Sequence, residues 1–157
     1  MKTYETPKSN VSYCKEAELT IKKKNSLFEK KKITSSIEAA EYIKQFYHED
    51  IDIYESFFML MMNKKNQTIA YAKISQGGLS AVIVDGRIIG KYAIDALAQG
   101  VIIAHNHPSG SLVPSKEDIK LTEKVQKILE ILDVKLIDHI IVTSGNGCYS
   151  FRDNGKL

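Results

Sequence analysis

A short apolar run that ends in histidines and leads into an amphipathic helix constrains the fold of this chain most strongly. The run 101–105 is almost wholly apolar until its last residue, which is typical of a central strand covered on both faces. Pro108 ends the strand, because proline cannot donate to a strand ladder. Ser115 then begins a helix predicted to reach about Leu132, with apolar residues at helical spacing. This order predicts a sheet against which a helix packs.

The flanking segments supply more elements of the same kind. Ser35 and Glu38 have the spacing of a capping box, so a helix should begin there, and Gly100 is expected to end the next helix. The expected helices cover 35–47 and 86–98, and the expected strands cover 53–63, 66–75, 136–143 and 148–151. Helices that interleave with strands predict the α/β or α+β class, with a mixed β-sheet packed between helices.

Charge is unevenly distributed along the 157 residues. Residues 1–35 carry nine lysines and four glutamates, whereas the remainder carries thirteen basic and fifteen acidic residues. We therefore interpret 1–34 as a basic N-terminal arm, with a short strand near 18–22, and 35–157 as one domain. The lysine runs at 22–24 and 30–32 could make weak contacts with nucleic-acid phosphates, or they could form a solvated edge that discourages strand pairing.

The sequence also gives expectations about the compartment. The longest apolar run, Phe57 to Met62, is too short to cross a bilayer, so no membrane contact is expected. The start MKTYETPKSN has no apolar signal region, which favours a cytoplasmic protein. Cys14 and Cys148 form no C-x-x-C pair and are expected to be free thiols. The sequence does not indicate an oligomeric state.

Two histidines and an aspartate have the spacing of a metal site. His105 and His107 lie on the same side of the strand end, with Cα atoms about 6–7 Å apart, so their imidazoles can converge on one cation. Asp118 lies three residues before Leu121 and seven before Val125, so it falls on the inward face of its helix. A carboxylate that faces a core is costly unless it is neutralised, and a divalent cation held by the histidines would neutralise it.

A purely structural interpretation is also available for each half of this pattern. Ser115 and Asp118 form S-x-x-D before an apolar run, which could simply cap a helix. The H-x-H pair could be a polar corner at a strand end. We favour a metal site because both halves occur together at a fixed distance, with the carboxylate directed inward.

The predicted ligands define a chemistry. Two histidines and one carboxylate leave one position for water on a tetrahedral zinc ion, although iron, cobalt or manganese could also bind such groups. A zinc-bound water becomes a nucleophile near neutral pH and needs a base and a hydrogen-bond donor for the attacked carbonyl. Ser115 could be the donor. Glu55, at the start of an apolar strand, is the best candidate for the base, unless it merely reaches solvent at the strand end.

The spacing of these residues also resembles a known signature. His105, His107, Ser115 and Asp118 reproduce H-x-H-x7-S-x-x-D, the signature of the JAMM (MPN+) metalloproteases. More narrowly, the strings IAHNHPSG at 103–110 and DHIIV at 138–142 resemble the bacterial RadC family. This similarity extends from about Ile33 to the C-terminus.

The resemblance implies a set of roles. It implies zinc ligands at His105, His107 and Asp118 with a water as fourth ligand, transition-state support from Ser115, and a catalytic glutamate at Glu55. The implied fold is the JAMM cytidine-deaminase-like arrangement, and the implied activity is cleavage of peptide or isopeptide bonds in a peptide or protein substrate. Two rival functions are a DNA-repair-associated protein that binds or processes nucleic acid, and a non-catalytic interaction domain.

Two details depart from the family pattern. Asn106 stands where the usual JAMM signature has Ser or Thr, as is typical of RadC relatives. RadC proteins commonly carry an N-terminal helix-hairpin-helix module, and residues 1–34 are too short and too poor in glycine for one.

His139, within an apolar strand, is expected to be a core histidine with a hydrogen-bond partner rather than a metal ligand.

Overall fold

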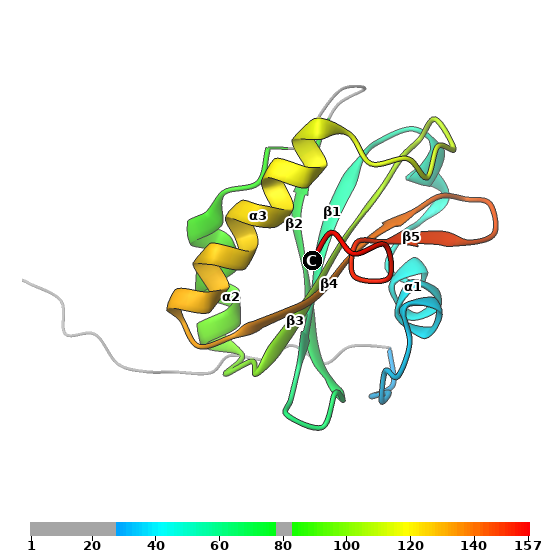
Figure 1. Cartoon of the computed structure of the whole chain (residues 1–157). Coiled ribbons are helices and arrows are strands. Elements are labelled where there is room, and N and C mark those ends of the chain that lie inside the picture. Colours follow the sequence, from blue (N-terminus) through cyan, green and yellow to red (C-terminus); the bar gives the residue numbers. More distant parts are fainter. Residues whose placement is uncertain (1–27, 78–82) are drawn as a thin grey trace, which may run out of the picture.

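Five strands form one mixed sheet in the computed structural model, which describes residues 28–77 and 83–157 (Figure 1). The elements in chain order are α1 (Ser36–Lys44), the 3₁₀ helix η1 (Glu49–Asp52), β1 (Ser56–Met62), β2 (Thr68–Gln76), α2 (Gly86–Asp95), β3 (Gly100–Asn106), α3 (Lys116–Ile131), β4 (Lys135–Val142) and β5 (Cys148–Ser150). The fold is α+β with a mixed sheet, as predicted.

The strand order β2-β1-β3-β4-β5 places β3 in the middle of the sheet. β3 pairs antiparallel with β1 and parallel with β4, which it reaches through α3. Every residue of β3 is buried, as the apolar run predicted. The register sets Phe57 opposite His105 and Ile103 opposite His139, so side chains from three strands gather at one end of one sheet face.

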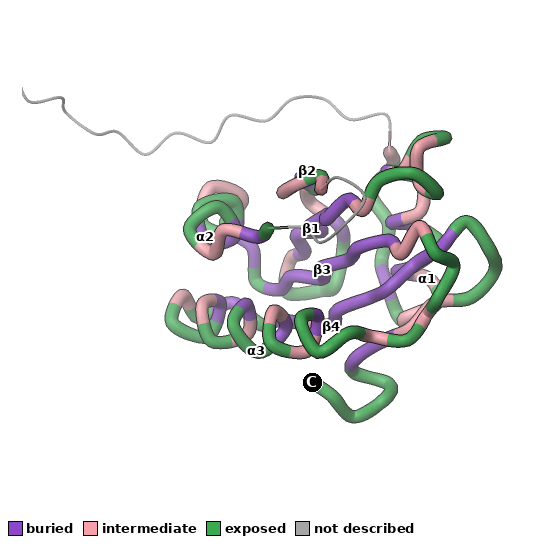
Figure 2. Tube along the Cα trace, turned by 90° about the horizontal axis from the view of Figure 1, so that it is seen from above, coloured by how far each residue is buried: buried purple, intermediate pink, exposed green. Residues whose placement is uncertain are grey.

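Helices cover both faces of the sheet, α1 on one side and α2 with α3 on the other (Figure 1). Seen from above, the buried strands lie between helices whose outer surfaces are exposed (Figure 2). The α2 and α3 side of the core contains, among others, Phe57, Met59, Met61, Ile89, Ala93, Val101, Ile103, Val125 and Leu129. The α1 side contains, among others, Ala40, Ile43, Phe46, Phe58, Leu60, Ile102, Ala104, Ile140 and Val142. The alternation of strand residues between these two sets follows from the two-residue period of a strand.

Several predicted boundaries were wrong by two or three residues; the first helix, for example, ends at Lys44 rather than at residue 47. The strand expected from residue 53 begins only at Ser56, because residues 49–52 form η1 and Ile53 has a helical backbone conformation. Gly100 does not end α2. The chain instead leaves α2 through Leu97, which has a φ of 50°, and the Ala98 N–H donates to Ala93 O in the last turn. Gly100 is the first residue of β3.

The described chain begins with a short stretch that packs against the sheet. The ring of Phe28 contacts those of Phe46 and Tyr71, and Lys32 forms an isolated bridge with Gln67. The predicted strand near residues 18–22 and the thiol of Cys14 lie outside the described residues. No helix in the described part of the chain has the length and apolar character needed to cross a membrane.

Candidate metal centre

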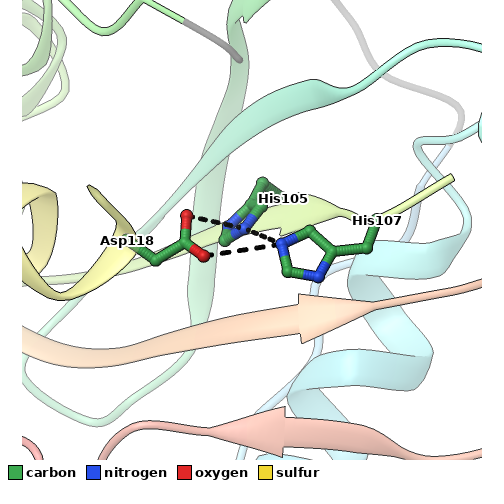
Figure 3. A group of neighbouring side chains, drawn as sticks. All are labelled: His105, His107 and Asp118. Atoms are coloured by element: carbon green, nitrogen blue, oxygen red, sulfur yellow. Dashed lines mark hydrogen bonds and ion pairs between the residues drawn. The ribbon is translucent and has the colours of Figure 1, made fainter. Parts of the chain in front are cut away.

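Three side chains converge where β3 ends and α3 begins (Figure 3). His105 Nε2 lies 3.2 Å from Asp118 Oδ1, and His107 Nε2 lies 3.5 Å from Asp118 Oδ2. The two Nε2 atoms are 3.0 Å apart. The structure therefore brings together the three residues that the sequence predicted as ligands, in a group that could hold a metal ion.

The donor set fits a small divalent cation. Bonds of about 2.0–2.1 Å in tetrahedral geometry place ligand atoms about 3.3 Å apart, close to the separations of these three side chains. Two imidazole nitrogens that face each other need a proton or a cation between them, because two lone pairs would repel. His105 and Asp118 are buried and His107 is half-buried, so the group lies in a site with restricted water access.

Electrostatics also favour a cation at this point. Burial alone would raise the pKa of Asp118, but hydrogen bonds from His105, His107 and Ser115 and the charge of His105 outweigh burial and hold that pKa well below its ordinary range. The hydrogen bond to Asp118 raises the pKa of His107 against the opposing effect of burial. The carboxylate is therefore ionised at any physiological pH and attracts positive charge to the site.

Helix capping fixes the position of Asp118. Ser115 is the N-cap of α3, and its Oγ accepts the Asp118 N–H at 3.1 Å. In return, Asp118 Oδ2 accepts both the backbone N–H and the hydroxyl of Ser115, each at 2.7 Å. The capping interpretation of S-x-x-D is thus confirmed, and it coexists with the metal-type geometry. The role of Ser115 in transition-state support stays a prediction.

Glu55 lies on the wall of the same pocket. The pocket has a volume of about 430 Å³ and is lined by Glu55, Phe57, His105, His107, Ser115, Glu117, Asp118 and Leu121. Burial raises the pKa of Glu55, against the opposing positive charges of the two histidines. A carboxyl group whose pKa is shifted toward neutrality is suited to proton transfer. All five predicted site residues therefore border one pocket, and the catalytic role of Glu55 stays a prediction.

His139 lies behind His105, on the side away from the pocket. The prediction of a core histidine was right, because His139 is fully buried and its nitrogens contact His105 Nδ1 at 2.9 Å and Thr122 Oγ1 at 2.6 Å. Burial and the neighbouring His105 lower the pKa of His139 well below the ordinary value, so its ring is neutral. Sequence reasoning missed the link to His105, and it assigned no role to Thr122.

Asn106 was also missed as a functional residue. It lies between the two histidines and is fully buried, with its side chain on the opposite sheet face from theirs. Its amide group binds three backbone groups, namely the N–H of Ser56 and the carbonyls of Ile51 and Tyr54. The groups of Tyr54 and Ser56 flank Glu55, so Asn106 anchors the segment that carries the candidate base. The available signal was a polar residue at the end of an apolar strand.

The fold and this site define a class, an α+β domain in which a strand end and a helix start direct two histidines and an aspartate into a pocket. The chain belongs to the RadC-like JAB domain family, whose sequence model matches residues 33–156. This match covers most of the described chain and includes all five candidate site residues.

Curated relatives show the same relationship. The chain is 42% identical over 125 residues to a UPF0758 protein of Flavobacterium johnsoniae, covering 80% of this chain and 53% of that protein. It is 40% identical over 103 residues to the UPF0758 protein YfjY of Escherichia coli, covering 66% of this chain and 64% of that protein. A UPF0758 protein of Porphyromonas gingivalis is 40% identical over 103 residues, or 66% of this chain and 45% of that protein. The chain thus spans about half to two thirds of the length of these relatives.

Proposed function

We propose that this protein is a zinc-dependent hydrolase that cleaves peptide or isopeptide bonds in a peptide or protein substrate. One observation carries the proposal: His105, His107 and Asp118 converge on a pocket that Glu55 also lines. Histidine nitrogens with one carboxylate form a ligand set that zinc uses in catalytic sites. When bound, zinc supplies Lewis-acid activation of water and of a substrate carbonyl.

The side chains of this protein then divide the remaining work. Glu55 accepts a proton from the attacking water and returns it to the leaving amine, a role that its raised pKa supports. Ser115 lies on the pocket wall, and its hydroxyl, which donates to Asp118 Oδ2 in this structure, can turn to donate to the oxygen on which negative charge develops. Asp118 and the two histidines hold the cation, and the surrounding buried strands keep those ligands in place.

The other expectations extend this proposal. Cytoplasmic location is expected from the sequence. Weak nucleic-acid contact would involve the lysine-rich residues 1–34, and the run at 22–24 lies outside the described residues. Mere binding of DNA or a purely non-catalytic interaction role would leave the convergence of Glu55 with the three ligands without a purpose. We therefore favour the hydrolase.

Metal analysis tests the first part of the proposal. The purified full chain should contain about one zinc per chain, and the Asp118→Ala variant should contain far less, because the remaining two histidines bind zinc weakly. Elemental analysis of both proteins after dialysis measures this. Equal and sub-stoichiometric zinc in the two proteins would refute the site.

Cleavage of a peptide library by the zinc-loaded chain, followed by mass spectrometry, tests the second part. The Glu55→Gln variant should keep its zinc but cleave more slowly by about 100-fold or more, since general acid–base catalysis contributes about 10²–10⁴-fold. Undiminished cleavage by Glu55→Gln would exclude its role as the base.

A further inference from the structure

A line of hydrogen bonds behind His105 leads back to Asp118. His105 Nδ1 lies 2.9 Å from His139 Nε2, and His139 Nδ1 lies 2.6 Å from Thr122 Oγ1. Thr122 Oγ1 lies 2.7 Å from the backbone carbonyl of Asp118, one helical turn earlier in α3. Two candidate metal ligands are therefore joined through two residues that lie outside the set of ligands.

The direction of each hydrogen bond follows from the carbonyl at the end of this line. A carbonyl oxygen only accepts, so the Thr122 hydroxyl donates its single proton to Asp118 O. Thr122 Oγ1 must then accept from His139 Nδ1–H. A neutral imidazole carries one proton, so His139 Nε2 is an acceptor and receives the Nδ1–H of His105.

The opposite direction is disfavoured by the same geometry. If Thr122 donated to His139 Nδ1, its oxygen would face Asp118 O at 2.7 Å with no proton between the two acceptors. Two buried acceptor oxygens at that distance repel each other, so this direction is unfavourable. In the opposite direction the single proton of a neutral His105 would lie on Nε2, which faces Asp118 and His107 and is the atom that a bound cation needs.

Packing keeps water out of this line and fixes the rings. His139 and Thr122 are 0% and 1% exposed, respectively. The ring of His139 stacks on Phe151 with centroids 4.5 Å apart and planes at 11°. The ring of Phe57 is its second aromatic neighbour, with centroids 5.9 Å apart. The ring therefore has little freedom to reverse its hydrogen bonds.

We propose that His139 and Thr122 are positioning residues that hold His105 with its proton on Nδ1 and its Nε2 lone pair directed at the cation position. This inference rests on the proposed metal site and adds to it two residues that fix the tautomer and orientation of the ligand His105. A ligating histidine commonly donates its other N–H to a carbonyl or a carboxylate, and loss of that partner costs 10–100-fold in metal affinity. Here a neutral histidine takes the place of that partner, and Thr122 orients it.

The tautomers can be read without any metal. Long-range ¹H–¹⁵N NMR of the metal-free full chain should show His105 protonated on Nδ1 and His139 protonated on Nδ1 alone. A proton on His139 Nε2 would overturn the inference, whatever the metal content of the protein.

Zinc affinity provides the second measurement, by competition with a fluorescent chelator. His139→Phe should weaken zinc binding 10–100-fold, because His105 loses its acceptor. His139→Gln should restore most of the affinity, since its amide oxygen can accept from His105 Nδ1. Thr122→Val should weaken binding about 10-fold and Thr122→Ser should not, because serine keeps the hydroxyl. Phe151→Leu is the matched control, as it removes the stacked ring but no hydrogen bond.

The outcomes separate this inference from the proposed function. Wild-type protein that binds zinc, with His139→Phe no weaker than Phe151→Leu, would overturn the positioning role and leave the metal site intact. Wild-type protein that binds no zinc would refute the site and the positioning role together. Loss of affinity in His139→Phe with recovery in His139→Gln supports the inference.

Discussion

The side chain of Asn106 binds the backbone of Ser56, with Oδ1 accepting the Ser56 N–H at 2.7 Å. The same amide donates to the carbonyls of Ile51 and Tyr54. Glu55 is held between two of these three anchored residues, while the neighbours of Asn106 along β3 are the predicted ligands His105 and His107. One residue thus connects the strand of the metal ligands to the segment of the candidate base.

Asn106→Ser should release that segment without disturbing the ligands, whose side chains lie on the other face of β3. Serine is too short to reach all three backbone groups, and buried groups left unpaired cost about 1–3 kcal/mol. We expect unfolding by urea to show a loss of that size. Hydrogen exchange at the Ser56 amide should accelerate by about 10-fold or more. Zinc affinity should change by less than about 3-fold, whereas the rate of any hydrolysis should fall by a larger factor than the zinc affinity.

Asn154→Ser provides the matched control for this substitution. Asn154 is exposed and makes one side-chain bond, to Ser150 O. Its loss should cost less than about 0.5 kcal/mol, as is usual at the surface. If Asn106→Ser weakened zinc binding as strongly as it slowed hydrolysis, Asn106 would be supporting the ligands rather than Glu55.

Ser115 and Ser35 allow the capping role of a serine to be separated from a role in the site. Each serine is an N-cap whose side chain accepts a backbone N–H three residues on. Replacement of either by alanine should destabilise the protein by about 1 kcal/mol, measured by chemical denaturation. Only Ser115→Ala should also reduce hydrolysis by the zinc-loaded protein, by about 10-fold or more. Equal hydrolysis in the two variants would restrict Ser115 to capping.

The fold could be predicted where local patterns and tertiary packing agree. The apolar run of β3 and the capping pair at Ser35 and Glu38 each produced the expected element, because burial on both faces and a satisfied N-terminus leave few alternatives. The predicted element boundaries were wrong where the backbone adopts a conformation that the hydrophobic pattern does not indicate. Leu97 adopts a left-handed conformation that is uncommon for its residue type, and η1 replaces the first residues expected in a strand.

The candidate site could be predicted from the sequence only where its residues lie close together in the chain. His105, His107 and Asp118 share a short stretch of chain, so strand and helix periodicity were enough to place them on one point. Thr122 and His139 lie 17 residues apart, and their contact depends on how α3 packs against β4. No local pattern encodes that packing. Asn106 was visible as a departure from the family signature, but its partners are about fifty residues away in the chain.

Zinc affinity should depend on pH through His107. Its pKa is raised by the hydrogen bond to Asp118, and zinc needs the neutral imidazole. The pKa of His107 lies above the ordinary value of 6.5. Zinc affinity should therefore fall by up to about 10-fold per pH unit as the pH drops below that raised pKa. Chelator competition between about pH 6 and pH 8 measures the slope.

The stability of the metal-free protein should fall as pH rises, whereas its zinc affinity should increase. A histidine whose folded-state pKa is raised contributes stability that is fully present below its unfolded pKa and is lost as pH rises through the folded pKa. Relative to His107→Gln, metal-free wild type should thus be most stable at mildly acid pH in urea denaturation. His48→Gln, at an exposed position outside the pocket, is the control. A wild-type advantage that grows with pH would contradict the ion pair between His107 and Asp118.

Asp138 should give a pH dependence of the same sign, in a more acid range, on the other face of the sheet. It is buried, and burial raises its pKa even though Ser150 Oγ and the backbone N–H groups of His139 and Arg152 all donate to it. A carboxyl group with a raised folded-state pKa binds a proton more tightly in the folded protein. Stability is therefore lost as pH rises from the unfolded pKa through the folded pKa.

Asp138→Asn should remove that loss. The asparagine oxygen can still accept both backbone N–H groups, and the side chain stays neutral at every pH. Measured by urea denaturation between about pH 3.5 and pH 7, the stability of Asp138→Asn relative to wild type should rise with pH and then level off. Asp133→Asn makes the same chemical change at an exposed position and serves as the control. Parallel profiles for wild type and Asp138→Asn would mean that the three donors compensate fully for burial, whereas a relative stability that falls with pH would mean that they overcompensate.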